Sequence, residues 1–139
     1  MDLSIIITSY NYENFLEESI QSCLRQKTNF KYEIIVVDDG STDNSQEISS
    51  KFSKFCRVYN IENSGVEIAA NFGIEKALAP YVLRLDADDA IHENLVEVLL
   101  SSIKVNNTAF AYSNYNTVDE KSNIISSMHL PAFNKKEIF

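Results

Sequence analysis

Three aspartates stand within four residues directly after a short apolar run, because residues 82–89 read Val-Leu-Arg-Leu-Asp-Ala-Asp-Asp. Such a run between helical patterns indicates a buried strand of an α/β sheet, and ligands bind beyond the carboxyl ends of such strands. Alternation would place Asp86 and Asp88 on one side and Asp89 on the other. Crowded carboxylates resist joint ionisation unless a cation is present. The stretch therefore predicts a hard divalent cation held by one or two carboxylates and by ligand phosphates.

Polar residues also follow two earlier apolar runs, residues 3–8 and 32–37. The first run ends in Thr-Ser-Tyr-Asn at residues 8–11, and the second leads into Asp-Asp-Gly-Ser-Thr-Asp at residues 38–43. In a parallel sheet all three strand ends lie along one edge, so they predict one acidic, hydroxyl-bearing crevice. Tyr10 and Tyr12 offer an aromatic face for a nucleobase, and Asp39 can accept a hydrogen bond from a base N–H. Asp43 is better explained as a helix cap.

The order of the apolar patterns predicts an α/β fold. Helical stripes alternate with strand-like runs, which favours a three-layer α/β/α arrangement with a mostly parallel sheet. The predicted strands are residues 3–8, 32–37, 57–61, 82–85 and 108–115. The predicted helices are residues 13–26, a second after residue 43, 65–78 and 93–104, with Phe55 and Ile68 among the expected inward positions. A turn and a short strand are expected within residues 118–126, and no structure is assigned to residues 128–139.

Composition and charge exclude several classes of function. The 139 residues carry a net charge of −8, which argues against a nucleic-acid partner and means that an anionic ligand needs a bridging metal. Cys23 and Cys56 are isolated in sequence and are expected to be buried, reduced thiols of a cytoplasmic protein. No signal peptide and no apolar run long enough for a membrane span are found in the sequence.

Four motifs stand in order along the chain: Ile-Thr-Ser-Tyr-Asn at 7–11, Val-Val-Asp-Asp-Gly-Ser-Thr-Asp at 36–43, Asn-Ser-Gly at 63–65 with Ala-Asn-Phe-Gly at 70–73, and Leu-Asp-Ala-Asp-Asp at 85–89. Together they resemble the N-terminal half of the inverting family 2 glycosyltransferases, which have the GT-A fold. The resemblance spans residues 3 to about 126. Any one of the four parts alone would be a weak signal.

The resemblance implies a nucleoside-diphosphate sugar donor, commonly a uridine diphosphate sugar, and a bound Mn²⁺ or Mg²⁺. It assigns roles to nine residues. Nucleotide-binding roles fall to Thr8, Tyr10, Asp39, Asn71 and Asp86, the metal to Asp88, and supporting roles to Asp38, Gly65 and Asp89. Within this set Asp86 would face the ribose or the diphosphate, and Gly65 would allow close backbone approach. Arg84, which precedes the acidic motif, is open between a site residue and a surface residue.

The expected reaction is sugar transfer with inversion. The metal at Asp88 would neutralise charge on the departing nucleoside diphosphate, while an acceptor hydroxyl attacks from the opposite face with help from a general base. In the family that base lies in the second half of the domain, and no residue here is a convincing candidate, including Asp119, Glu120, His92 and His129.

Residues 1–139 are therefore expected to be the N-terminal part of a single GT-A domain that lacks its acceptor-binding half. We favour a piece of a longer enzyme over a natural short form that binds without catalysing. The acceptor would be an unknown glycan or a lipid-linked molecule. The full-length protein is expected in the cytoplasm, with peripheral attachment to the inner face of the membrane as an option.

Three other functions compete with this interpretation. A non-catalytic nucleotide-binding module would share every binding residue and differ only in the absence of transfer. A phosphoacceptor receiver domain would share the acidic residues Asp38, Asp39 and Asp86, but a complete strand–helix unit precedes Asp38, where a receiver would begin. A dinucleotide-binding enzyme is disfavoured because no Gly-x-Gly-x-x-Gly follows the first strand.

Overall fold

A computed structural model describes residues 1–131 of the chain. Two compact units are present, Met1–Val98 and a second that begins at Leu99. The first unit holds alternating strands and helices: β1 (Leu3–Ser9), α1 (Leu16–Leu24), β2 (Tyr32–Asp38), α2 (Ser45–Lys51), β3 (Arg57–Asn60), α3 (Val66–Lys76) and β4 (Tyr81–Asp86). Helix α4 (Leu95–Asn106) crosses the boundary, and the second unit adds β5 (Tyr115–Val118) and β6 (Ile124–Met128). No helix within residues 1–131 is long and apolar enough to cross a membrane.

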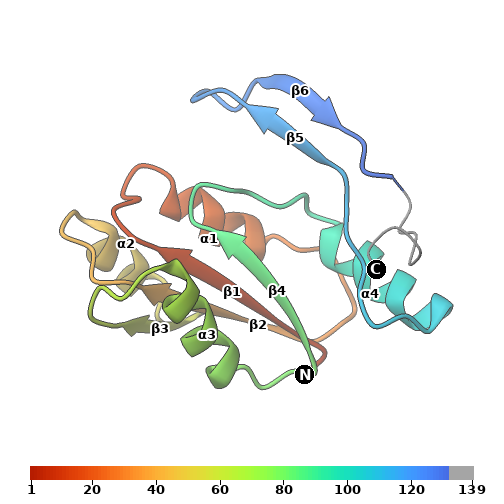
Figure 1. Ribbon diagram of the computed structural model, residues 1–139, viewed down its shortest axis with the longest axis horizontal. Helices are drawn as coiled ribbons and strands as arrows, with labels where there is room; N and C mark the ends of the chain where they lie inside the picture. The colour runs from red at the N-terminus through yellow and green to blue at the C-terminus, as the bar shows by residue number, and fades with distance from the viewer. Residues whose placement is uncertain (132–139) are drawn as a thin grey trace. The chain divides into compact units, whose positions relative to one another are not determined.

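The first unit is built on a parallel sheet with helices on both faces (Figure 1). The strand order is β3-β2-β1-β4, and every neighbouring pair is parallel. Helix α3 packs on one face against β1 and β2, whereas α1 and α2 cover the other face. The predicted α/β/α layering with a mostly parallel sheet is confirmed.

Strand β1 is the centre of the core, because all seven of its residues are buried. On the α3 side, Ile6 packs in a cluster with Ile35, Val37 and Ala69. Helix α3 approaches this cluster closely at Gly73, where a Cβ atom would lie 2.4 Å from the Cγ2 atom of Ile6. A larger residue at position 73 would force α3 away from the sheet.

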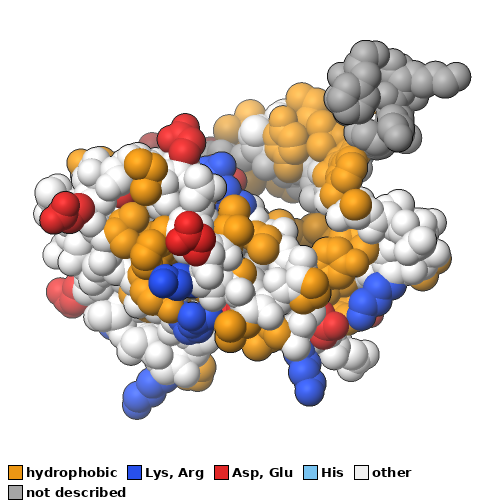
Figure 2. All heavy atoms as spheres, turned by 60° about the horizontal axis from the view of Figure 1, so that its bottom comes forward, with side chains coloured by type: hydrophobic (Ala, Val, Ile, Leu, Met, Phe, Trp, Pro, Cys, Tyr) orange, Lys and Arg blue, Asp and Glu red, His pale blue; other side chains and the backbone are white. Residues whose placement is uncertain are grey.

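Two residues that were expected to face the core, Ile68 and Phe55, are exposed instead. Small residues of α3 face the sheet, so the bulkier Ile68 is turned outward and is 55% exposed. Phe55 is 69% exposed, because α2 already ends at Lys51. Hydrophobic side chains are also exposed at several places on the face shown in Figure 2.

The acid-tipped strand is also less buried than predicted. Strand β4 lies at an edge of the four-stranded sheet and pairs only with β1 among the described strands. Val82 is 41% exposed, and Leu85 is the buried residue of the strand. An apolar run identifies a strand, but it does not reveal whether that strand has neighbours on both sides.

Two element boundaries differ from the prediction. Helix α1 begins at Leu16 rather than residue 13, because Asn11 adopts a left-handed conformation (φ 59°) and residues 12–15 form a turn. The strand predicted at 108–115 is wrong: residues 107–114 form no strand, and β5 pairs antiparallel with β6. The predicted turn between residues 118 and 126 is present, and Asp119 holds it by accepting the N–H groups of Lys121 and Asn123.

A largely buried carboxylate, Glu33, links the start of the sheet to the α3–β4 connection. The Glu33 carboxylate accepts hydrogen bonds from Ser4 Oγ (2.7 Å), Arg57 Nη1 (2.9 Å) and the N–H of Leu78 (2.8 Å). Burial raises the pKa of Glu33, but the hydrogen bonds from Ser4, Arg57 and Leu78 outweigh it and leave the pKa below its ordinary value of 4.5. These bonds fix where β4 starts and therefore where its acidic end lies.

We expect Glu33→Gln to lower the free energy of unfolding by about 1–3 kcal/mol at pH 7, since charge-assisted bonds to a carboxylate are lost. A lowered folded-state pKa stabilises the fold above the unfolded-state pKa, and this contribution disappears as the pH falls through the folded value. The difference between wild type and variant should therefore shrink below pH 4.5. Urea denaturation at several pH values measures it.

The matched control is Glu47→Gln, because Glu47 forms an exposed ion pair with Lys51 (3.3 Å) on α2. Its loss should change stability by no more than about 0.5 kcal/mol. Equal effects of the two substitutions would contradict a special role for Glu33.

Candidate functional site

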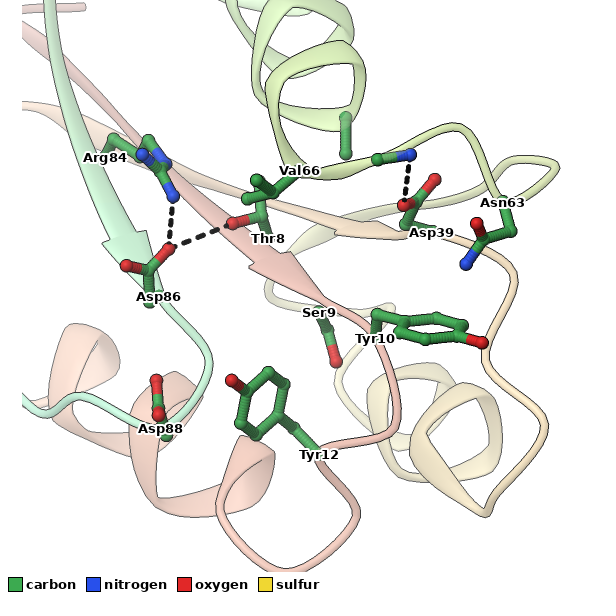
Figure 3. Close-up of a pocket in the computed structure, with 12 residues that line it drawn as sticks. Thr8, Ser9, Tyr10, Tyr12, Asp39, Asn63, Val66, Arg84, Asp86 and Asp88 are labelled. Carbon is green, nitrogen blue, oxygen red and sulfur yellow. Dashed lines mark hydrogen bonds and ion pairs between the residues drawn. The ribbon is translucent and has the colours of Figure 1, made fainter.

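A cavity of about 510 Å³ opens at the carboxyl edge of the sheet, on the side covered by α3 (Figure 3). The loops that follow β1, β2 and β4 meet there, as the sequence predicts. Its lining comes from these loops, from the strand ends and from the start of α3: Thr8, Ser9, Tyr10, Tyr12, Asp39, Asn63, Gly65, Val66, Ala69, Arg84, Asp86 and Asp88.

The loops after β1 and β2 are locked together by reciprocal hydrogen bonds. The N–H of Asn11 donates to Ser41 Oγ (2.9 Å), and the N–H of Thr42 donates back to Asn11 Oδ1 (2.8 Å). The N–H of Tyr12 donates to Ser45 Oγ (3.0 Å) in the same way. These bonds hold in place the turn that carries Tyr10, a residue that is 45% exposed and lines the cavity.

Asp43 belongs to this lock and does not line the cavity. Its Oδ1 atom accepts the N–H of Ser45, the first residue of α2, and its Oδ2 atom accepts the N–H of Glu13. Burial raises the pKa of Asp43, but the hydrogen bonds from Ser45 and Glu13 outweigh it and lower the pKa. Asp43 thus binds the first N–H of α2, as the capping role favoured by the sequence requires, although the residue directly before the helix is Asn44.

Two adjacent aspartates at the end of β2 have different tasks. Asp38 is fully buried and accepts hydrogen bonds from the N–H and Oγ of Ser41 and from Gln46 Nε2. These bonds stabilise the turn that follows β2. Asp39 lines the cavity, and its carboxylate accepts the N–H groups of Ser64 (2.8 Å) and Gly65 (2.9 Å). Asp39 thereby brings the loop before α3 to the cavity.

Gly65 is required for its backbone conformation. Its φ of 96° lies in the left-handed region that favours glycine, and it immediately precedes α3. An added Cβ would meet only Glu67 Oε2 at 3.7 Å, so protein atoms leave room for a side chain. The predicted close backbone approach at Gly65 concerns a ligand and stays a prediction.

Asn71 is the one predicted nucleotide-binding residue that the structure places outside the cavity. It is exposed on α3, whereas Val66 and Ala69 of the same helix line the cavity. Two residues after Ala69 correspond to a rotation of about 200° around a helix, which turns Asn71 away. Asn71 therefore lies outside the cavity, and its nucleotide-binding role stays a prediction.

The end of β4 brings Asp86 beside β1. Thr8 and Asp86 are direct partners in the β1–β4 register, and Thr8 Oγ1 lies 3.4 Å from Asp86 Oδ1. The same Oδ1 atom accepts a 2.5 Å bond from Arg84 Nη2. Arg84 therefore belongs to the cavity, and the strand alternation that brings it to the side of Asp86 could have revealed this from the sequence.

Figure 3 separates the cavity into two sides. Tyr10, Asp39 and Asn63 lie together on one side, and Arg84 and Asp86 lie on the other. Both Asp86 and Asp88 line the cavity and Asp89 does not, as predicted, although β4 ends at Asp86 and a turn, not strand alternation, places Asp88.

Tyr12 differs from the expectation that it offers a face to a base. Its hydroxyl lies near Asp88 and not beside Tyr10 (Figure 3). The negative charge of Asp88, together with burial and Asp86, raises the pKa of Tyr12. The Tyr12 side chain therefore belongs to the acidic side of the cavity.

Carboxylates crowd this acidic side. Burial raises the pKa of Asp89, and the charges of Asp88 and Asp86 raise it further. Within residues 1–131, no three His, Cys, Asp or Glu side chains form a metal site by themselves. Oxygen ligands in this small number fit Mg²⁺ or Mn²⁺, which bind through one or two carboxylates together with substrate phosphates.

Comparisons with known proteins identify the family of this chain. The glycosyl transferase family 2 model matches residues 4–138. An uncharacterized glycosyltransferase of Rickettsia felis is 37% identical over 129 residues, which is 91% of this chain and 21% of that protein. The chain thus spans about a fifth of the length of this relative.

Solved structures show the same fold. S. aureus TarS 1-349 in complex with UDP has a TM-score of 0.70 and 28% identity over 77% of this chain and 33% of that one, and a TarS complex with UDP-GlcNAc gives a TM-score of 0.68. The mannosyltransferase PcManGT of Pyrobaculum calidifontis, in complex with GDP-Man and Mn²⁺, has a TM-score of 0.55 over 63% of this chain at 23% identity, so it supports the fold alone. From the family match and this fold, the chain belongs to glycosyl transferase family 2.

Proposed function

We propose that this chain binds a uridine diphosphate sugar with Mn²⁺ or Mg²⁺ and is the donor-binding part of an inverting glycosyltransferase. The observation that carries the proposal is the convergence of Tyr10, Asp39, Asp86 and Asp88 on one cavity. The TarS complexes with UDP and UDP-GlcNAc support a uridine nucleotide.

The two sides of the cavity match the two ends of a nucleoside diphosphate. Tyr10 would stack on the base, and Asp39 would accept a base N–H with oxygen lone pairs that remain after its bonds to Ser64 and Gly65. Asp86 would receive the ribose hydroxyls. Asp88 would hold the metal, which supplies positive charge to the diphosphate and to the departing nucleotide.

The protein's own part in the reaction is to position the donor. The locked loops fix the base side, and the β1–β4 register fixes the acidic side. Transfer also needs a base to take the proton from the acceptor hydroxyl. Asp119 and Glu120 are the two turn residues weighed as candidates from the sequence, and Asp119 is engaged by the backbone of the β5–β6 turn.

The unknown glycan or lipid-linked acceptor, the general base and the inverting course are therefore assigned to the full-length protein, of which residues 1–139 would be the N-terminal part. A cytoplasmic location with peripheral membrane attachment remains part of the same proposal.

The metal role predicts that nucleotide affinity depends on Asp88. Wild-type protein should bind UDP at least about 10-fold more tightly with Mn²⁺ than with chelator, because bare diphosphate meets the carboxylates of Asp86 and Asp88. Asp88→Asn should bind UDP equally with and without Mn²⁺. Isothermal titration calorimetry measures both.

Asp43→Asn is the matched control, since it makes the same chemical change in a carboxylate that does not line the cavity. It should lower stability by about 0.5–1.5 kcal/mol, because an amide keeps only one of the two acceptor oxygens that bind Ser45 and Glu13, and it should keep the metal dependence. Wild-type affinity that is unchanged by chelator would contradict the metal role.

If Asp39 recognises the uracil, Asp39→Ala should weaken UDP binding about 10-fold with Mn²⁺ present, because a hydrogen bond to a buried carboxylate is lost. The substitution also releases the loop at Ser64 and Gly65. Glu47→Ala, on the exposed surface of α2, should have no effect. Fluorescence titration with UDP measures the affinities. Unchanged affinity in Asp39→Ala would show that Asp39 does not bind the uracil.

The lack of a convincing general base among residues 1–131 predicts binding without catalysis by this chain. Incubation of this chain with a uridine diphosphate sugar, Mn²⁺ and a panel of glycan acceptors should release no UDP above the rate without protein. Robust turnover would show that residues 1–139 contain the base. Donor and acceptor added to the full-length protein separate an enzyme from a non-catalytic nucleotide-binding module.

A further inference from the structure

We propose that Arg84 is a positioning residue of the donor site, which orients Asp86 for recognition of the ribose hydroxyls. The inference deepens the proposed function and rests on it. Arg84 is the basic residue among those that line the cavity in the described part of the chain.

Strand geometry places Arg84 there. Arg84 and Asp86 are two residues apart on β4, so their side chains leave the strand on the same side. Their register partners on β1 are Ile6 and Thr8, and Ile6 belongs to the cluster beneath α3. Arg84 thus lies on the α3 side of the sheet, at the edge of the cavity (Figure 3).

The hydrogen bonds to Asp86 are one-sided. Its Oδ1 atom accepts Arg84 Nη2 at 2.5 Å and lies 3.4 Å from Thr8 Oγ1. No donor within residues 1–131 bonds its Oδ2 atom. A carboxylate held through one oxygen is restricted in rotation, and its second oxygen is left to accept from a ligand.

Ribose hydroxyls are donors of the right kind for this oxygen. Phosphates carry no proton to offer a carboxylate at neutral pH, so Asp86 repels the diphosphate and favours the sugar. The side chains of Arg84 and Asp86 are 48% and 49% exposed. An ion pair so exposed contributes little to the stability of the fold. Its main effect is therefore to orient the Asp86 carboxylate.

The role predicts a specific loss in nucleotide discrimination. With Mn²⁺ present, wild-type protein should bind UDP about 10-fold more tightly than 2′-deoxy-UDP or 3′-deoxy-UDP. Arg84→Met should reduce this ratio to about 1, as Asp86→Asn should, while its affinity for the deoxy analogue that lacks the recognised hydroxyl stays near the wild-type value. Arg84→Lys, which keeps a cationic donor, should recover part of the ratio.

Lys51→Met is the matched control, because it removes the same charge from an exposed ion pair on α2. It should leave the ratio unchanged, and thermal melts of all variants should stay near wild type. An equal loss for UDP and both analogues in Arg84→Met would assign Arg84 to the phosphates and overturn the inference. An unchanged ratio in that variant, or a wild-type ratio of 1 for both analogues, would overturn it as well.

Failure of the proposed function is distinguishable from these results. In that case wild-type protein would not bind UDP at all with Mn²⁺, whatever the variants do.

Discussion

The parallel register of β1 with its two neighbours is the constraint on which the rest of the site depends. Thr8 lies opposite Val37 on one side and opposite Asp86 on the other, and Ser9 lies opposite Asp38. The polar end of each strand therefore arrives at the same level. A one-residue shift would turn the β4 side chains to the opposite face and remove Asp86 from the cavity.

Neutral and charged donors then fix the carboxylates that this register gathers. Backbone N–H groups hold Asp39, an arginine holds Asp86, and Asp38 is satisfied inside its own turn. Asp88 and Asp89 are the pair in which repulsion remains visible, because Asp88 helps to raise the pKa of Asp89. A metal with a diphosphate is the kind of ligand that this remaining charge fits.

Much of this arrangement could be predicted from the sequence. Apolar runs that end in polar clusters indicate parallel strand ends, and that rule alone brings Thr8, Tyr10, Asp39, Asp86 and Asp88 to one cavity. The helix cap at Asp43 and the layered fold follow from equally local patterns. Burial of Cys23 and Cys56 was also predicted correctly, and burial raises their pKa values to about 12 and about 11.

The errors concern properties that depend on neighbours. The sequence does not say that β4 is an edge strand, so Val82 was expected to be buried. Asn71 is turned away from the cavity by the phase of α3. The Tyr12 hydroxyl lies near Asp88, which the sequence alone does not reveal. The sequence left Arg84 open between a site residue and a surface residue. Its partner Asp86 is two residues away, and the two side chains lie on the same side only where the chain is extended.

A crystal structure of this chain with UDP and Mn²⁺ tests the central claim most directly. The account predicts anomalous density for Mn²⁺ within about 2.2 Å of an Asp88 oxygen and of diphosphate oxygens. It also predicts the uracil between Tyr10 and Asp39. Uracil outside this cavity, or Mn²⁺ bound without Asp88, would contradict the account.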